Sequence, residues 1–307
     1  MQKQDLQIHN FSWSDLDALA ELLFASSEDS SLDKKFAVAQ LERSYRKPGL
    51  VPERDCFLAW SGSKLAGYYF LIEEKAISRG ILEGTVHPEF RNHGIGKELI
   101  KNALAQARSM HYEVLHANIS SNEQAIRKLL LSNGFKQVKE LLHMHQDYAK
   151  SMAVEPSTNY RIRTMNSIEV EKLTILQNAA FVDSWGFCPN SVEQVTYSLN
   201  DLFPGLINTS VFLEFKEVPV AYIWVRQTST KRHGCIDMVG VHPEFRGKGL
   251  AKIITASGIN YLCANGMPSI SISVLDDNTP AVRTYEGLGF EVRERNPWYE
   301  LDLSRSN

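Results

Sequence analysis

Two short stretches of this sequence have the composition of an anion site. The hexapeptide Val-His-Pro-Glu-Phe-Arg occurs at residues 86–91 and again at residues 241–246. Small residues follow both copies, at Gly94 and Gly96 in the first and at Gly247, Gly249 and Ala251 in the second. Backbone N–H groups in the first turn of a helix lack an intrahelical partner and carry partial positive charge. Because small residues let an anion approach those groups, each stretch predicts a phosphate site at a helix start.

Neither stretch fits a nucleotide-binding motif. The G-x-x-x-x-G-K-S/T pattern of a P-loop is missing from both. A dinucleotide-binding fingerprint needs a third small residue, and here Leu99 or Ile254 lies at or beside that position. Such a fingerprint also follows the first strand of its unit, whereas this motif follows roughly the fourth expected strand. A tight turn without a ligand is the remaining alternative to a phosphate site.

The repetition extends beyond this motif. Matching segments lie downstream, at Asn122 and Ala125 before Gly134-Phe135, and at Asn278 and Ala281 before Gly289-Phe290. A repeat of about half the chain length indicates two copies of one domain rather than a solenoid of short units. The 307 residues suffice for two domains, each with its own core.

Composition excludes several classes of protein. With 43% hydrophobic and 22% charged residues and a net charge of −3, the chain lacks the basic balance that general nucleic-acid binding requires. No apolar run approaches the length of a membrane span, and the N-terminus lacks the apolar core of a signal peptide. The four cysteines lie without C-x-x-C spacing, which favours reduced thiols and a cytoplasmic protein. His143 and His145 share a strand face without a third metal ligand, so we expect them to be structural and expect no metal site.

The elements that position the motif repeat in the same order in each half. Expected strands and helices of the first half are a strand at 5–11, helices from Ser14 and at 34–45, and strands at 55–60, 65–73 and 80–86. The second half has a strand at 160–165, helices at 170–181 and 192–200, and strands at 210–215, 220–227 and 235–241. In each half a helix then begins at the glycine motif, followed by a buried strand (114–119 or 270–275), a short helix and two terminal strands. This order predicts an α+β fold with a mixed sheet flanked by helices in each domain. We expect domains at 1–149 and 159–307, joined by a short polar linker at 150–158.

The pattern R-x-x-G-x-G/A, preceded by V-x-P and followed downstream by N-x-x-A-x-x-x-Y-x-x-x-G-F, resembles the GNAT superfamily of N-acetyltransferases. The match covers both halves and implies a tandem GNAT protein that uses acetyl-CoA as co-substrate. In that family the motif loop holds the pyrophosphate, and the pantetheine arm lies between two splayed strands, here at 239–241 and 273–275. The implied cofactor-binding residues are Val86, Arg91, Asn92, His93, Gly94, Ile95 and Gly96 in the first domain, and Val239, Gly240, Val241, Arg246, Gly247, Lys248, Gly249, Leu250, Ala251 and Asn278 in the second.

The resemblance also implies catalytic residues, and only in the second half. GNAT enzymes commonly use the tyrosine of the downstream block, here Tyr285, to protonate the departing CoA thiolate. Counting from Ala125, the first half has Leu129 in its place, which predicts a non-catalytic first domain. Asp237 is the candidate general base, with a surface carboxylate as the alternative. Glu83 lies one register step away and cannot face the same way unless a β-bulge intervenes.

Substrate contacts are expected near the segment between the first two helices of the second domain. Asp183, Trp185 and Phe187 lie in this aromatic, turn-rich segment, and Trp224 lies on a nearby strand. The resemblance implies that GNAT substrates meet this segment, although aromatic residues in such places also commonly form core.

The second half is similar to mycothiol synthases, notably in D-N-T-P-A-V-R-T-Y-E-G-L-G-F, but the acidic residue of that family is replaced at or near Cys235. The leading hypothesis is an acetyl-CoA-dependent N-acetyltransferase that acts on the amine of a small molecule by direct transfer. The alternatives are an acyl-CoA sensor without turnover and acetylation of a cysteinyl pseudodisaccharide, as the similarity to mycothiol synthases implies. We expect a monomer or homodimer with no nucleic-acid or membrane partner.

Overall fold

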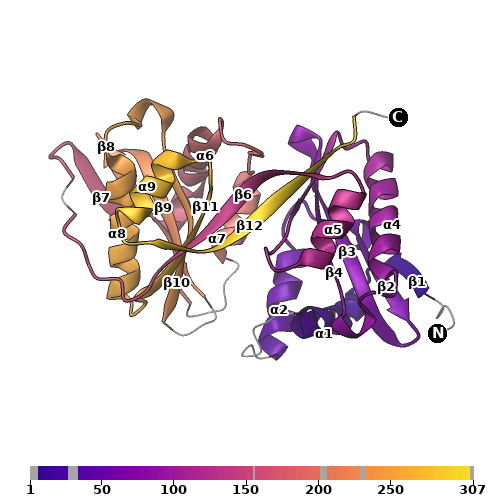
Figure 1. Ribbon diagram of the computed structural model, residues 1–307. Helices are drawn as coiled ribbons and strands as arrows, with labels where there is room; N and C mark the ends of the chain where they lie inside the picture. The colour runs from indigo at the N-terminus through magenta and orange to yellow at the C-terminus, as the bar shows by residue number, and fades with distance from the viewer. Residues whose placement is uncertain (1–5, 27–33, 155, 201–205, 229–231, 305–307) are drawn as a thin grey trace. The chain divides into compact units, whose positions relative to one another are not determined.

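The computed structural model describes residues 6–26, 34–154, 156–200, 206–228 and 232–304. The chain forms two compact units (Figure 1). Unit 1 contains Met1–Val138 and Pro297–Asn307, and unit 2 contains Lys139–Asn296. Each has a mixed sheet flanked by helices, which confirms the predicted α+β class. None of the described helices is long and apolar enough to cross a membrane.

The sheet of unit 1 follows the order β1-β2-β3-β4-β5-β12. Its strands are β1 (Leu6–Asn10), β2 (Cys56–Ser61), β3 (Lys64–Glu74), β4 (Arg79–Val86), β5 (Val114–Asn118) and the end of β12 (Glu291–Asp302). The helices are α1 (Leu16–Ser26), α2 (Lys34–Tyr45), α3 (Pro52–Asp55), α4 (Ile95–Ser109) and α5 (Gln124–Ser132). Side chains alternate along β3, so Phe70 packs with the α1 core, and Leu71 packs with the α4 core.

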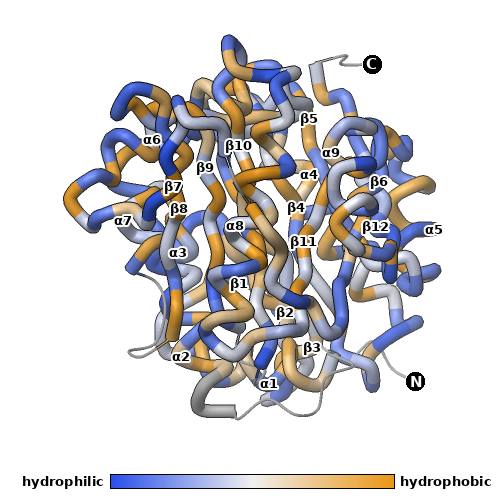
Figure 2. The backbone as a smooth tube through the Cα atoms, turned by 90° about the vertical axis from the view of Figure 1, so that its left-hand side faces the viewer, coloured by the Kyte–Doolittle hydropathy of each residue, from blue (hydrophilic) through white to orange (hydrophobic). Residues whose placement is uncertain are grey.

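The sheet of unit 2 follows the order β6-β11-β10-β9-β8-β7. Its strands are β6 (Lys136–Gln146), β7 (Tyr160–Thr164), β8 (Asn208–Phe215), β9 (Val218–Gln227), β10 (His233–Val241) and β11 (Ser269–Leu275). The helices are α6 (Val170–Phe181), α7 (Val192–Asn200), α8 (Leu250–Ala264) and α9 (Thr279–Glu286). The apolar residues of α8 and β9, orange in Figure 2, form much of the core on one face, and α6 and α7 cover part of the other.

The two halves of the chain exchange their last strands. β6 follows α5 directly, yet its residues from Leu141 to Gln146 pair with β11 in unit 2. β12 follows α9 directly, yet Trp298 to Asp302 pair with β5 in unit 1. Both are long strands in Figure 1. Among the described residues each half therefore ends in one long strand instead of the two that were expected.

This exchange places the boundaries elsewhere than predicted. The sequence suggested domains at 1–149 and 159–307, whereas the chain passes between units near residues 138 and 296. Buried residues alternate at the end of β6, and partly buried residues alternate with exposed ones along the first half of β12, as in any half-buried strand. Such a pattern does not specify which sheet accepts the strand.

Candidate active site

The central strands of unit 2 separate toward the glycine motif. β10 and β11 pair in parallel from His233 with Ser269 to Ile236 with Ile272, where the described ladder ends. Beyond that point β10 stays paired with β9 as far as Val241, and β11 stays paired with β6 as far as Leu275. Two strand edges therefore diverge, and an extended ligand could add between them as a further strand.

A β-bulge lies where the strands separate. The register of β10 against β9 shifts between Ile236 and Met238, so Asp237 is the extra residue. In unit 1, β4 pairs with β3 without a shift in register. Glu83 lies three residues before Val86 and Met238 lies three residues before Val241, so these two residues are counterparts. Asp237 thus has no counterpart in unit 1, which explains the one-step offset between the two acids.

The glycine motif of unit 2 forms an open cradle at the start of α8. Gly247 and Gly249 both have φ of 75°, and a Cβ added to either would meet nothing within 4 Å. Gly249 is the N-cap residue of α8, and no side chain hydrogen-bonds to this helix end in the described structure. The free N–H groups of the first turn are therefore available to an anion.

Unit 1 has the same backbone at this place. Gly94, with φ of 85°, is the N-cap residue of α4, and Asn92, with φ of 65°, takes the position of Gly247. Asparagine is one of the few residues with a side chain that adopt this conformation readily. Both units consequently retain the geometry of a phosphate cradle.

The motif arginines bind the protein itself. Nε of Arg246 donates to the carbonyl of Val241 at 3.4 Å, and Nε of Arg91 donates to that of Val86 at 3.3 Å. The guanidinium of Arg246 also donates to both carboxylate oxygens of Asp183, at 2.6 and 3.0 Å. This pair lowers the pKa of Asp183. In this structure Arg246 holds the loop against the end of α6, and Asp183, expected to meet substrate, is its partner.

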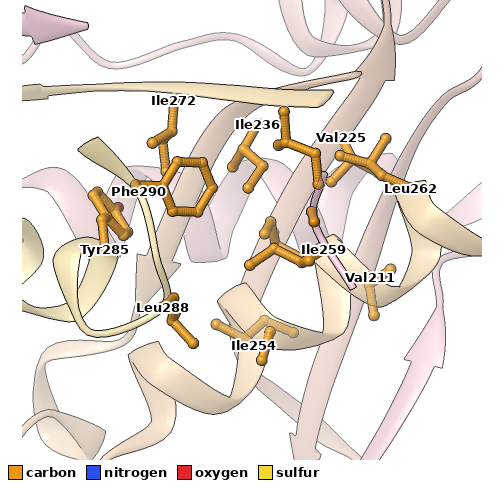
Figure 3. Close-up of a cluster of buried hydrophobic side chains, with 14 of the residues drawn as sticks. Val211, Val225, Ile236, Ile254, Ile259, Leu262, Ile272, Tyr285, Leu288 and Phe290 are labelled. Atoms are coloured by element: carbon orange, nitrogen blue, oxygen red, sulfur yellow. The ribbon is translucent and has the colours of Figure 1, made fainter. Parts of the chain in front are cut away.

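Tyr285 lies on α9 with only 7% of its surface exposed. Figure 3 shows its ring beside Phe290 at the hydrophobic core of unit 2, with 6.2 Å between ring centroids. Burial raises the pKa of Tyr285 well above its usual value, so the hydroxyl stays protonated at neutral pH. Asn278 begins this helix and accepts a hydrogen bond from the N–H of Ala281, which is a capping contact.

The comparisons with known proteins agree with this geometry. A model of the acetyltransferase (GNAT) family matches residues 171–290, and one of the acetyltransferase (GNAT) domain matches residues 52–137. A mycothiol acetyltransferase from Renibacterium salmoninarum is 31% identical over 76% of this chain and 71% of its own. Another, from Streptomyces scabiei, is 27% identical over 93% of this chain and 91% of its own. A tandem GNAT protein from the clavulanic acid biosynthesis pathway has a TM-score of 0.77 at 17% identity, covering 99% of this chain and 100% of its own. The chain belongs to the GNAT acetyltransferase family.

The first half of this acetyltransferase has a leucine at the position equivalent to Tyr285. The N–H of Phe135 donates to the carbonyl of Leu130 at 3.2 Å, as the N–H of Phe290 donates to that of Tyr285 at 3.0 Å. Leu130, not the Leu129 obtained by counting from Ala125, is therefore the counterpart, because α5 contains one extra residue before its end. A leucine has no proton to donate, so the functional expectation for unit 1 is unchanged.

Two ionisable residues near the bulge of the acetyltransferase, Asp237 and Cys235, are poorly suited to accept a proton. Asp237 accepts two hydrogen bonds from Nε of Arg226, at 2.8 and 2.6 Å. Cys235 lies two residues before the bulge, and burial raises the pKa of its thiol to about 12. A thiol of that kind is protonated at neutral pH and is a poor base.

The predicted substrate residues differ in their surroundings. Trp224 is 5% exposed and donates from Nε1 to Asn208 Oδ1 at 2.6 Å, so it belongs to the core under α6 and α7. Phe187 is half-buried and stacks on Phe181, and Trp185 is half-buried in the same segment. These two remain the better placed of the expected aromatic contacts.

The sequence interpretation missed a polar face on the sheet of unit 2. His143 and His145 of β6 lie there with His233 of β10, and the rings of His145 and His233 stack at 5.8 Å. Burial lowers the pKa of both stacked histidines. No sequence signal linked these residues, because β6 belongs to the first half of the chain and pairs in the second unit.

Proposed function

We propose that this acetyltransferase transfers the acetyl group of acetyl-CoA to the amine of a small molecule, with the chemistry in unit 2. The observation that carries this proposal is that unit 2 combines diverging strands, an open glycine cradle and a protonated, buried tyrosine. Unit 1 shares the cradle geometry but has Leu130 in place of the tyrosine.

Each part of unit 2 has a role in this reaction. The N–H groups at Gly249, Leu250 and Ala251 would bind the pyrophosphate, and the backbone at 239–241 would pair with the pantetheine arm. The amine nitrogen attacks the thioester carbon, the C–S bond breaks, and the CoA thiolate takes the proton of the Tyr285 hydroxyl. The amine proton must pass to a base. Asp237 fits that role less well than the sequence suggested, because Arg226 already neutralises its carboxylate.

An acetylation assay tests this function. The protein is incubated with acetyl-CoA and, separately, with lysine, spermidine, tyramine, glucosamine and cysteinyl-glucosamine, and loss of the thioester and acetylated product are measured. Turnover of any of these amines above the rate without protein supports the proposal. Tight acetyl-CoA binding without turnover of any amine would favour a sensor of acyl-CoA.

A narrower candidate is acetylation of a cysteinyl pseudodisaccharide. The support for it is that relatives named mycothiol acetyltransferase align with up to 96% of this chain. The replacement, at or near Cys235, of the acidic residue that the resemblance implies argues for a different base or a different acceptor. Cysteinyl-glucosamine in the assay discriminates, because a preference for it over glucosamine by more than about tenfold would support this candidate.

For unit 1 we propose a binding role without chemistry. Its cradle at Gly94 can hold CoA, or it is a remnant of such a site. A ligand that binds only the folded state stabilises it, so CoA in unit 1 would raise the melting temperature.

A further inference from the structure

The polar face of unit 2 is formed by alternate residues of adjacent strands. On β11, Ile270, Ile272 and Val274 are buried in the core with α8, so Ser271 and Ser273 face the other way. Ser273 of β11 lies directly opposite His143 of the neighbouring strand β6, so the two side chains share that face. This is the face on which α6 packs mainly against β9 and β10.

Ser273 stands where the two central strands part. The last described pair of β10 and β11 is Ile236 with Ile272, so Ser273 is the first residue of β11 beyond the ladder. It is exposed, and the bulge at Asp237 lies at the same level of β10. The hydroxyl of Ser273 is thus at the closed end of the opening in which the thioester arm is proposed to lie.

His143 is bonded on both ring nitrogens. Nδ1 lies 2.9 Å from Ser273 Oγ, and Nε2 lies 2.9 Å from the side-chain amide nitrogen of Asn296. The nitrogen and oxygen of the Asn296 amide are told apart only by their hydrogen bonds, and we assign the oxygen to the side of His143. Nε2–H then donates to Asn296 Oδ1, and Nδ1 accepts the hydrogen of the Ser273 hydroxyl. A serine, a histidine and an orienting amide in this order form a proton-accepting relay.

We propose that His143 is the general base of acetyl transfer and receives the amine proton through the hydroxyl of Ser273. As the amine nitrogen attacks the thioester carbon, its proton passes to Ser273 Oγ, and the serine proton passes to Nδ1 of His143. The imidazolium later releases its proton to water. This inference rests on the proposed function and supplies the base that the paired Asp237 and the protonated Cys235 do not.

The other ionisable groups of this face are otherwise engaged. His145 stacks on His233, whose two ring nitrogens both contact serines, at 3.0 Å from Ser269 and 3.0 Å from Ser271. Asp237 pairs with Arg226, and Asp147 pairs with Arg293. Glu294 is close enough to influence the pKa of His145. None of these described groups has the contact with Ser273 that His143 has.

Unit 1 lacks this pair. When the buried residues of β5 are matched to those of β11, Asn118 is the equivalent of Ser273. The residue opposite Asn118 on the neighbouring strand is Trp298. The unit without the tyrosine is therefore also the unit without the serine and the histidine. Loss of both proton-transfer groups in the same unit is expected if the two act in one reaction.

The pH dependence of kcat/KM tests the assignment of His143 as the general base. The substrate is cysteinyl-glucosamine or, if the enzyme does not accept it, the amine that the acetylation assay shows to react fastest. A general base acts only in its unprotonated form, so kcat/KM of the wild type should fall on the acidic side of its pH profile. His143→Gln keeps hydrogen-bonding groups but does not titrate. We expect it to lower kcat/KM by about 10²–10⁴ and to remove this acidic limb, with CoA affinity and melting temperature unchanged. Ser273→Ala should lower kcat/KM and keep the limb, because the base itself is still present.

His145→Gln is the matched control on the same strand and should keep both the rate and the limb. A His143→Gln enzyme with the wild-type limb and a rate within about threefold of wild type overturns the assignment while leaving the proposed function intact. A wild-type protein that acetylates no amine overturns both.

Discussion

Leu130 and Tyr285 occupy the same place in the two units. The backbone carbonyl of each accepts the N–H of a phenylalanine five residues later, and both side chains are buried. Tyr285 has a hydroxyl proton that it can donate, whereas Leu130 has none. In the proposed reaction this difference separates the unit that protonates the leaving thiolate from the one that does not.

Replacing Tyr285 by phenylalanine should therefore lower kcat by about 10²–10⁴, because the ring and its packing remain while the proton donor is lost. CoA affinity should be unchanged, and steady-state kinetics with calorimetric CoA binding measure both quantities. Tyr68→Phe is the control, since Tyr68 is a similarly buried tyrosine of unit 1. If both variants keep the wild-type kcat, another group protonates the thiolate.

The strand exchange predicts that the C-terminal end of the chain stabilises unit 1. Tyr299 of β12 is fully buried in the core of unit 1, so Tyr299→Ala should lower the free energy of unfolding by about 3–5 kcal/mol. Urea unfolding measures the loss, and hydrogen exchange should accelerate at Leu115 and Ala117 of β5. Tyr148→Ala, at a site that is 86% exposed, should cost less than about 0.5 kcal/mol. Faster hydrogen exchange confined to unit 2 would contradict the assignment of β12 to the sheet of unit 1.

The hydroxyl of Tyr299 offers a finer check. It is buried, and no described group hydrogen-bonds to it. Tyr299→Phe should consequently be neutral or stabilising, because a buried polar group without a partner costs free energy. A loss above about 1 kcal/mol in urea unfolding would mean that the hydroxyl has a partner in solution.

A buried ion cluster predicts how stability depends on acid. Arg163 of β7 donates to Glu169 and Glu214, and these bonds hold the pKa of Glu169 at about 2. A carboxyl whose pKa is lowered by folding contributes stability above its unfolded value, near pH 4.5, and loses it as the pH falls toward 2. Glu169→Gln should remove up to about 3 kcal/mol at pH 7 and flatten the acid-induced loss in that interval. Parallel stability curves for the two proteins between pH 5 and pH 2 would rule this out.

Local chemistry was predictable from the sequence, whereas long-range pairing was not. The glycines of the motif were expected at a helix start, and Gly249 is indeed the N-cap of α8, because positive φ and free N–H groups are local properties. The bulge at Asp237 was expected only as one of two possibilities, since the one-residue offset between Glu83 and Asp237 fits either a bulge or two opposite faces. His143 was assigned a structural role, because nothing in the sequence shows that β6 crosses to the other unit. Leu130 was missed by one position, since the sequence shows one extra residue between Ala125 and Gly134 but not on which side of the tyrosine position it lies, and the hydrogen bond from Phe135 to Leu130 decides this.

The division of labour between the units is the central claim, and matched lesions at Gly94 and Gly249 test it most directly. Both residues are helix N-caps with positive φ and open space around the missing Cβ, so alanine imposes a similar backbone strain of about 1–2 kcal/mol on each. The measurement is the rate of acetyl transfer, with CoA stoichiometry determined on the same samples. Gly249→Ala should lower turnover and CoA binding in unit 2 together, while Gly94→Ala should change stoichiometry or melting temperature and leave most of the turnover. Loss of turnover in Gly94→Ala with wild-type turnover in Gly249→Ala would place the chemistry in unit 1 and contradict this account.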